Sequence, residues 1–349
     1  METEKLERYS SFYRMDLQDG PLLGCFLGTY YPLNRFQGAR TLPEGAVAPS
    51  DLDPEAFRSD YLRMHGQYAA AGGDALYSAS LLWGIPWMEV LSGCTAFADH
   101  STGSMRSVAP SPPCPADIPY FSESTPWVEK ADQFLRMLAS LEVEMPVGTT
   151  LMRGFSDLLS ALYGTPEFVY RLVDGGNDIR EIIHRLADLW IAFANFQLDR
   201  IQPVDGGVGS YFYSMWLPGR GVWLQEDASA LLSPELFEEF IMPAVRRVIS
   251  AFDTVLMHLH PAGYIPVDQL VETDLTAIEL HIDKGGPSAE ELLPYYRTIQ
   301  SKKPLVIWGD LTYNDLVFVR DNLDSRALSV IPVIEQPGEA AQVRELFVK

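Results

Sequence analysis

Strand-like and helix-like patterns alternate through the second half of the chain. Four short apolar runs are typical of buried strands and lie at residues 254–260, 275–283, 304–310 and 327–335. Segments with the apolar spacing of helices lie around them, at residues 233–252, 265–272, 288–301, 312–323 and 338–348. Two helix starts are marked, because Ser233 can cap a turn that begins with Pro234, and Ser288 and Glu291 form a capping box.

This alternation predicts a parallel sheet with helices outside it. The 349 residues suit one (β/α)8 TIM barrel with long loops, an α/β fold of typically ~250 residues that tolerates large insertions. We therefore expect a single domain over residues 1–349, with residues 1–60 as an N-terminal helical extension. An open, doubly wound sheet is the alternative, but the chain contains no GxGxxG or Walker sequence to favour it.

The first half of the chain is less regular. Three segments have helical spacing and lie at residues 53–72, 126–143 and 178–201. Residues 107–127 are rich in Pro and Ser, and residues 204–223 are rich in Gly and aromatic side chains. We expect both of these segments to be loops, and loops of this length in a compact domain are often functional.

A polar or ionisable residue stands at the carboxyl end of each predicted strand. Alternate side chains of a strand share one face, and His258 and His260 share it in the first strand. The matching residues of the next three strands are Glu279, His281 and Asp283, then Asp310, then Glu335. Barrel enzymes carry their active sites at this edge, and buried ionisable groups are costly unless they pair or bind a cation. The sequence therefore predicts a functional site here.

Imidazole and carboxylate groups together suit Zn²⁺, or a harder divalent ion such as Mn²⁺ or Fe²⁺. Two histidines at positions i and i+2, here His258 and His260, can supply two ligands to one ion. A metal-free site is the alternative, in which one of these histidines acts as a general acid or base.

The charge of the chain narrows the choice of partners. A net charge of -21 argues against nucleic acid and anionic membranes as partners, because both require a basic surface.

The N-terminus lacks the apolar core of a secretory signal, and no apolar run approaches the ~18–20 residues that span a bilayer. The three cysteines form neither a CxxC pair nor a disulfide framework. We therefore expect a cytoplasmic enzyme with a small-molecule substrate.

Aromatic and acidic residues outside the strands are further candidates. A pocket for a flat or methylated ligand could be lined by aromatic side chains, namely Trp83, Trp87, Tyr211, Tyr213, Trp216 and Trp223. The alternative is that these rings belong to the core. Glu226 and Asp227 precede the helix at 233–252, where they can act either as active-site acids or as helix caps.

Residues 225–252, followed by residues 254–280, resemble the uroporphyrinogen decarboxylase superfamily. The resemblance lies in an acidic segment that leads into an SPELF helix, and then in a strand that ends in a His-x-His-Pro-x-Gly sequence. It covers roughly residues 150–349, and residues 84–94 extend it. It implies a (β/α)8 barrel and two branches of activity, which are decarboxylation and cobalamin-dependent methyl transfer.

The methyltransferase branch implies a zinc site built from His and Cys. Here His258 matches the family histidine, whereas His260 and Glu335 stand where the family has cysteines. The resemblance thus implies a metal site of His258, His260 and Glu335, supported by acid–base or orienting residues. These supporting residues are Glu279, His281, Asp283, Asp310, Glu226 and Asp227. The expected activity is methyl transfer between a corrinoid, held on a carrier protein, and a small substrate, and a homodimer is compatible with it.

Two other functions stay open. A metal-independent decarboxylase of the uroporphyrinogen type would hold the substrate carboxylate with Arg35 or Arg40, although residues 24–40 lack the decarboxylase motif and keep only its arginines. Glu226, Asp227 or Asp283 would then protonate a carbanion. A non-catalytic protein that binds a corrinoid or another small ligand is the third reading, because fold alone does not confer activity.

Overall fold

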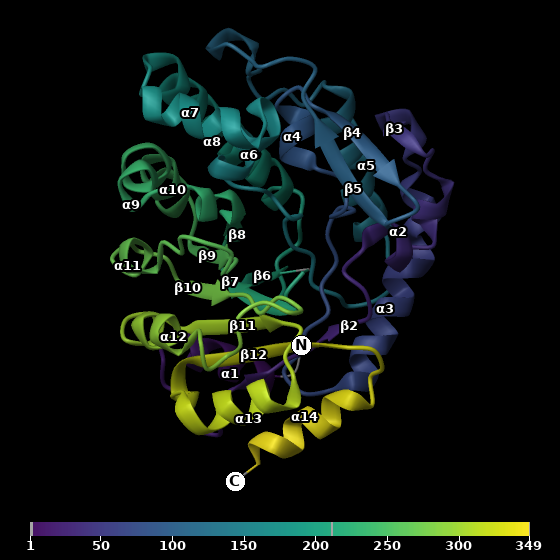
Figure 1. Cartoon of the computed structure of the whole chain (residues 1–349). Helices are drawn as coiled ribbons and strands as arrows, with labels where there is room; N and C mark the ends of the chain where they lie inside the picture. Colours follow the sequence, from purple (N-terminus) through teal and green to yellow (C-terminus); the bar gives the residue numbers. More distant parts are fainter. Residues whose placement is uncertain (1–2, 211, 349) are drawn as a thin grey trace.

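A parallel sheet of seven strands forms the centre of the computed structural model, which describes residues 3–210 and 212–348. Its order is β1–β12–β11–β10–β9–β8, and β2 also pairs with β12. The strands are β1 (Leu22–Leu23), β2 (Phe26–Leu27), β8 (Gly221–Gln225), β9 (Thr254–Leu259), β10 (Ala277–Leu280), β11 (Leu305–Gly309) and β12 (Leu328–Ile334). All of these pairings are parallel, so the carboxyl ends of the strands meet at one edge (Figure 1).

Helices follow the strands in the second half of the chain, and Figure 1 shows α10, α11 and α12 along one side of the sheet. They are α9 (Pro234–Leu236), α10 (Met242–Ile249), α11 (Val267–Leu270), α12 (Leu293–Gln300), α13 (Tyr313–Asn322) and α14 (Glu339–Phe347). Each predicted strand and helix of this half is therefore confirmed, with shifted boundaries. The predicted first helix is interrupted at Phe237–Ile241 by a π-helical turn, because Pro243 has no N–H to donate to the carbonyl four residues earlier.

The first half of the chain adds mainly helices. They are α1 (Thr3–Tyr13), α2 (Pro32–Arg35), α3 (Arg58–Ala71), α4 (Trp87–Leu91), α5 (Pro126–Ala139), α6 (Phe155–Tyr163), α7 (Thr165–Asp174) and α8 (Asn177–Leu198). An antiparallel sheet of three strands is formed by β3 (Gly45–Val47), β4 (Thr95–Asp99) and β5 (Ser104–Val108). The three helices predicted here are confirmed as α3, α5 and α8. No helix in the described residues is long and apolar enough to cross a membrane.

Two parts of the chain differ from the sequence-based expectation. Residues 204–223, expected as a loop, contain the hairpin of β6 (Gly207–Ser210) and β7 (Met215–Pro218). Its glycines allow close packing, since a Cβ on Gly209 would lie 2.2 Å from Ser78 Cβ. Residues 1–60 do not form a separate helical extension, because β1 and β2 from this segment pair with β12 inside the main sheet.

Beyond β8 the pairing continues only as isolated contacts among the described residues. Arg153 forms a parallel bridge with Gln225 of β8, and Ala79 forms one with Val147. On the opposite side, the Asp74 amide donates to the Leu23 carbonyl of β1 at 3.0 Å. The fold is therefore an α/β structure with a seven-stranded parallel sheet, and it is compatible with a TIM-like arrangement.

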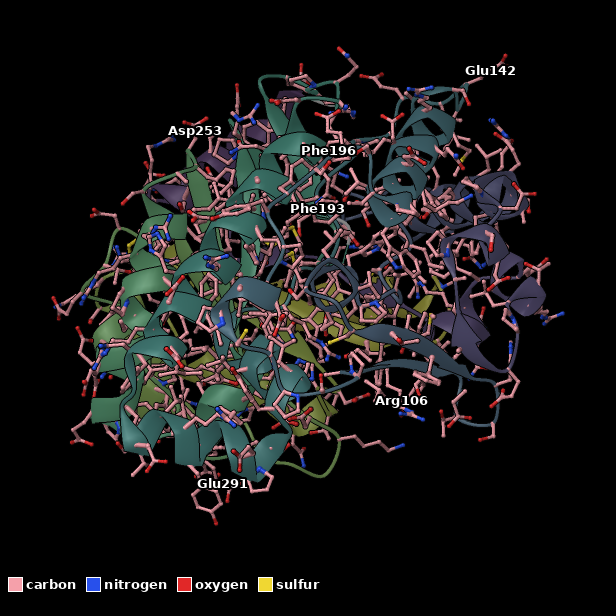
Figure 2. All side chains as sticks on the ribbon, turned by 90° about the horizontal axis from the view of Figure 1, so that it is seen from above. Arg106, Glu142, Phe193, Phe196, Asp253 and Glu291 are labelled. Atoms are coloured by element: carbon pink, nitrogen blue, oxygen red, sulfur yellow. The ribbon has the colours of Figure 1, made fainter. Side chains whose placement is uncertain are left out.

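The residues labelled in Figure 2 illustrate the exterior and the core of the molecule. The labelled Arg106, Glu142 and Glu291 project from the outer surface, and all three are exposed. Phe193 and Phe196 are buried and stack with their ring centroids 6.1 Å apart. These three charged side chains are thus solvated, as most charged side chains are.

Every residue of β9 is buried, and the strand separates two environments. Leu259 lies between His258 and His260 in the sequence, so its side chain points to the opposite face of the sheet. It is 1% exposed. We expect Leu259→Ala to lower the free energy of unfolding by about 2–5 kcal/mol, the usual cost of a cavity left by a buried leucine.

Urea denaturation measures this change, with Leu231→Ala as the matched control because Leu231 is 49% exposed. The control should cost less than about 0.5 kcal/mol. Equal losses in the two variants would contradict the assignment of Leu259 to the core.

Candidate metal centre

Six ionisable side chains meet at the carboxyl end of the parallel sheet. His258 belongs to β9 and pairs in register with Glu279 of β10. The other members follow strand ends directly, with Asp227 after β8, His260 after β9, and His281 and Asp283 after β10. Because parallel strands present their carboxyl ends together, segments far apart in the sequence deliver these groups to one place. Five of them are residues that strand alternation predicts to share a face.

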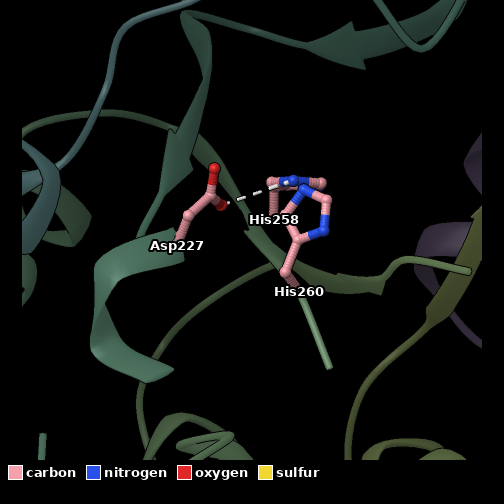
Figure 3. A group of neighbouring side chains, drawn as sticks. All are labelled: Asp227, His258 and His260. Atoms are coloured by element: carbon pink, nitrogen blue, oxygen red, sulfur yellow. Dashed lines mark ion pairs between the residues drawn. The ribbon is translucent and has the colours of Figure 1, made fainter. Parts of the chain in front are cut away.

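The two histidines of the His-x-His pair are each bound by a carboxylate. His258 Nδ1 is hydrogen-bonded to Glu279 Oε2, and His260 Nδ1 lies 2.9 Å from Asp283 Oδ2. The Nε2 atom of each ring is therefore available to bind a metal ion. His258 Nε2 lies 3.5 Å from Asp227 Oδ1, and the two imidazole centroids are 4.7 Å apart (Figure 3).

His281 joins the cluster between the remaining carboxylates. Its Nδ1 lies 3.7 Å from Glu279 Oε1, and its Nε2 lies 3.3 Å from Asp283 Oδ1. This packing produces three overlapping groups of possible ligand atoms. Within each group, the atoms lie within 4.8 Å of one another. They are Asp227, His258 and His260; His258, Glu279 and His281; and His260, His281 and Asp283.

Burial determines the protonation of His258 and Glu279, which form the inner pair of the cluster. It lowers the pKa of His258 to about 4, although the Asp227 carboxylate opposes this change. Burial also raises the pKa of Glu279 to about 7, against hydrogen bonding from His281. His258 is thus a neutral imidazole near pH 7, which is the form that binds metal ions.

His260 and Asp283 form the outer pair, and their pKa values shift in the opposite directions. Burial alone would lower the pKa of His260, but the Asp227 and Asp283 carboxylates outweigh it, so that the pKa is raised. Hydrogen bonding from His281 lowers the pKa of Asp283, and His260 adds to this effect against partial burial. Asp283 is therefore an anion beside His260 and His281.

Three polar atoms of the cluster are buried without a hydrogen-bond partner among the described residues. They are Asp227 Oδ1, Glu279 Oε1 and His281 Nδ1. Buried polar atoms are normally hydrogen-bonded, so these atoms are candidates to bind a ligand. Two ligands of a tetrahedral ion at ~2.0–2.1 Å lie ~3.3 Å apart. His258 Nε2 and Asp227 Oδ1 are 3.5 Å apart, which is close to that value, so this pair of donor atoms fits a divalent ion.

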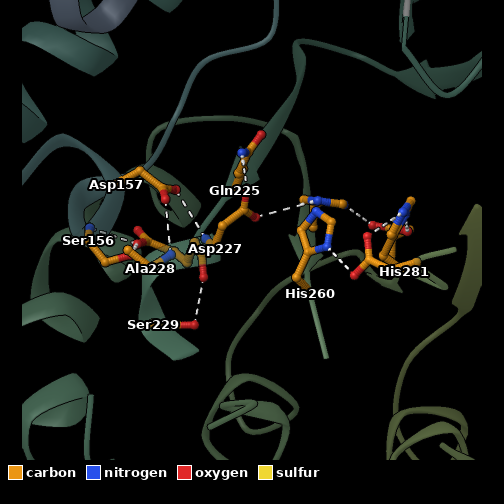
Figure 4. A network of polar contacts seen from close by, with 12 residues as sticks. Ser156, Asp157, Gln225, Asp227, Ala228, Ser229, His260 and His281 are labelled. Carbon is orange, nitrogen blue, oxygen red and sulfur yellow. Dashed lines mark hydrogen bonds and ion pairs between the residues drawn. The ribbon is translucent and has the colours of Figure 1, made fainter. Parts of the chain in front are cut away.

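The corner that carries Asp227 is fastened to helix α6 (Figure 4). The backbone N–H groups of Asp227 and Ala228 donate to the Asp157 carboxylate at 3.1 and 3.0 Å. In return, Glu226 accepts hydrogen bonds from the N–H groups of Phe155 and Ser156, at 2.9 Å each. Gln225 Nε2 donates to Asp227 Oδ2, which leaves Oδ1 directed at His258.

The sequence analysis offered Glu226 and Asp227 as active-site acids or as caps of the helix at 233–252, but Ser233 caps that helix. Asp227 belongs to the cluster. Glu226 is fully buried and binds the N-terminus of α6, where the Ser156 hydroxyl also donates to it at 2.5 Å. Burial raises the pKa of Glu226 to about 7. Its carboxylate belongs to none of the three groups of ligand atoms.

A cavity of about 280 Å³ opens beside the cluster. Its wall includes Asp227, Asp283 and all three histidines of the cluster, together with Trp83 and Tyr213, which the sequence analysis proposed as pocket residues. Five further residues line it that sequence reasoning did not place there, namely Tyr30, Leu151, Phe212, Gln225 and Trp308. The alternation of β11 could have indicated Trp308, since it shares the face of Asp310.

The other aromatic candidates pack elsewhere. Trp87 is 1% exposed, donates from Nε1 to the Leu82 carbonyl at 2.9 Å and contacts Trp127. Trp216 donates to the Val204 carbonyl at 3.0 Å. Trp223 stacks behind Tyr213 at a centroid distance of 3.5 Å and so supports the wall without lining it. Tyr211 lies outside the described residues.

Glu335 and Arg35 lie at a second, smaller cavity of about 180 Å³. The sheet explains their position, because β12 ends at Ile334 beside β2 and Glu335 then becomes exposed. Arg35 donates to the carbonyls of Leu27 and Thr29. The structure therefore does not bring Glu335 into the ligand groups or Arg35 into the main cavity.

Asp310 follows β11 and is half-buried. Burial and then the charge of Asp310 raise the pKa of Tyr30, which lines the main cavity. Asp310 itself belongs to none of the three ligand groups and does not line the main cavity.

No protein-family model matches this chain, and a search of curated proteins finds no match. The resemblance to the uroporphyrinogen decarboxylase superfamily therefore stays a prediction from the sequence. The geometry of the cluster and its cavity carries the functional argument.

Proposed function

We propose that this protein is a metal-dependent enzyme that binds one divalent ion through His258, His260 and Asp227. One observation carries this proposal. Both histidines have their Nδ1 atom bound by a carboxylate, while an orphaned oxygen, Asp227 Oδ1, faces His258 Nε2. Carboxylate–histidine–metal arrangements of this kind fix the tautomer and orientation of metal-binding histidines. Glu279 and Asp283 are the orienting carboxylates.

The bound ion would act as a Lewis acid that stabilises an anionic oxygen or sulfur of a small substrate. A set of three protein ligands leaves a coordination position open for such a group. His281 is the imidazole outside the proposed ligand set, and it borders the cavity. It can take the proton that a hydroxyl or thiol releases, while Asp283 at 3.3 Å stabilises the resulting imidazolium.

The reaction that we propose is methyl transfer between a corrinoid on a carrier protein and this small substrate. In this reaction His281 would accept the O–H or S–H proton of the substrate, so that the oxygen or sulfur becomes the nucleophile. The corrinoid would supply the methyl group and keep the electron pair of the broken bond. The sequence resemblance and the size of the cavity support this reaction, because about 280 Å³ suits a small molecule at the lower end of ligand pockets.

A TIM-like barrel is part of the proposal. The bridges of Arg153 with Gln225 and of Ala79 with Val147 extend the sheet beyond β8, in the direction that closure requires. The site would then occupy the end of the barrel where enzymes of this fold work. A tetrapyrrole decarboxylase is less favoured, because no Lys or Arg is among the described residues that line the main cavity.

Metal analysis of the purified protein tests the proposal. After growth with added Zn, Mn or Fe, we expect ~1 equivalent of one ion, which a chelator removes and which rebinds. Asp227→Asn should lower this occupancy, whereas the exposed Asp178→Asn is the matched control. Less than about a tenth of an equivalent, without rebinding, would refute the metal site. Cobalt absorbance during incubation with methylcobalamin and small thiols or alcohols then tests the methyl transfer.

A further inference from the structure

Five aromatic rings line the cavity and contact one another, and we call them the aromatic wall. They belong to Tyr30, Trp83, Phe212, Tyr213 and Trp308. Phe212 contacts Trp308, Trp83 and Tyr213 at centroid distances of 4.9, 5.3 and 5.3 Å. Trp308 also contacts Tyr30 at 6.4 Å. Rings that pack against one another in this way are held in fixed positions, so the wall is preorganised for a ligand.

A second part of the lining is acidic, and we call it the acidic wall. Asp227 and Asp283 line the cavity, and Glu279 is bonded to His258 directly behind it. The described lining residues include no Lys or Arg. The guanidinium whose charge interacts with Asp227 belongs to Arg153, and it is ion-paired with Glu89 at 3.1 Å outside the lining.

The lining disfavours an anionic ligand, because it includes the carboxylates of Asp227 and Asp283 and, among the described residues, no Lys or Arg. A ligand cation is compatible with this lining. The aromatic faces favour a ligand cation, because ring quadrupoles attract ammonium groups and aromatic cages recognise quaternary ammonium ligands.

We infer that the substrate is a small alkylammonium compound that carries a hydroxyl or thiol group. Its ammonium group would contact the aromatic wall formed by Phe212, Trp308 and their neighbours. Its hydroxyl or thiol group would face the cluster of histidines and carboxylates. This inference rests on the proposed function for the role of the second group, but recognition of the cation depends on the aromatic and acidic walls alone.

Calorimetric titration with choline and its neutral analogue, 3,3-dimethylbutan-1-ol, tests the inference, since the two differ in one atom, N⁺ or C. We expect choline to bind at least about tenfold more tightly, because a cation–π contact in a desolvated site has about that effect. Phe212→Leu should remove most of this selectivity. Phe121→Leu is the matched control, since Phe121 is also half-buried and packs against Phe193 and Phe196 instead.

Titrations of the zinc-loaded and the chelator-treated protein separate this inference from the metal site. Selectivity for choline in either form supports the inference, even if the protein fails to retain zinc. Equal or tighter binding of the neutral analogue, or no binding of choline at millimolar concentration in both forms, overturns it while leaving the metal site standing. Loss of selectivity in Phe121→Leu to the same extent as in Phe212→Leu would also overturn it.

Discussion

His258→Ala should lower the affinity for a divalent ion by at least about 100-fold. Loss of an orienting partner of a metal ligand typically costs 10–100-fold, and His258 is assigned as a ligand itself. Its substitution also leaves Glu279, which is 0% exposed, without the imidazole at Nδ1. The affinity is measured by competition with a chromogenic chelator, and turnover should fall in parallel with metal occupancy.

Two further variants discriminate between ligand sets. Asp227→Ala should reduce affinity about as strongly as His258→Ala, because Asp227 Oδ1 lies 3.5 Å from His258 Nε2. Glu335→Ala should have no effect, since this exposed residue lies at the second cavity. The exposed His184→Ala controls for the loss of any histidine. A large loss in Glu335→Ala with none in Asp227→Ala would reverse the assignment.

Strand alternation is sufficient to predict much of this cluster. Residues 254–260 and 275–283 are apolar enough to be recognised as buried strands, and parallel strands end at a common edge. The proximity of His258 and His260 to Glu279, His281 and Asp283 follows from these two facts. In the structure, Glu279 pairs in register with His258, as this pattern predicts.

The positions of the other residues around the site cannot be predicted from hydrophobic periodicity. Strands β1 and β2 contain two residues each, so no alternation reveals the sheet edge that places Tyr30 in the cavity and diverts Glu335 away from it. Composition marks a tryptophan as buried but not the direction that it faces. Trp83 and Trp223 are both 8% exposed, yet only Trp83 lines the cavity.

The distinct roles of Glu226 and Asp227 illustrate the same limit. Adjacent residues at the end of a strand point in different directions, and which of them enters the site depends on a contact with distant residues. Here the N-terminus of α6 binds the first carboxylate, and Gln225 holds the second. Nothing in the local sequence names helix α6 as the partner, because it lies 70 residues earlier in the chain.

Glu226→Ala should lower the free energy of unfolding by about 3–5 kcal/mol. It leaves three buried donors without an acceptor, which are the N–H groups of Phe155 and Ser156 and the Ser156 hydroxyl. Each unsatisfied buried donor costs about 1–3 kcal/mol. The substitution also removes the favourable interaction of the carboxylate with a helix N-terminus. The contact is tight, since a Cβ on Gly154 would lie 2.4 Å from Glu226 Oε1.

Urea denaturation of the metal-free protein measures the loss, and Glu226→Gln is the informative comparison. The amide keeps the size of the side chain and one acceptor oxygen, so we expect roughly half of the loss. The exposed Glu345→Ala should cost less than about 0.5 kcal/mol. Because Glu226 fastens the corner that carries Asp227, Glu226→Ala should also weaken metal binding in the protein that remains folded. Unchanged stability in Glu226→Ala would mean that this corner is held by Asp157 alone.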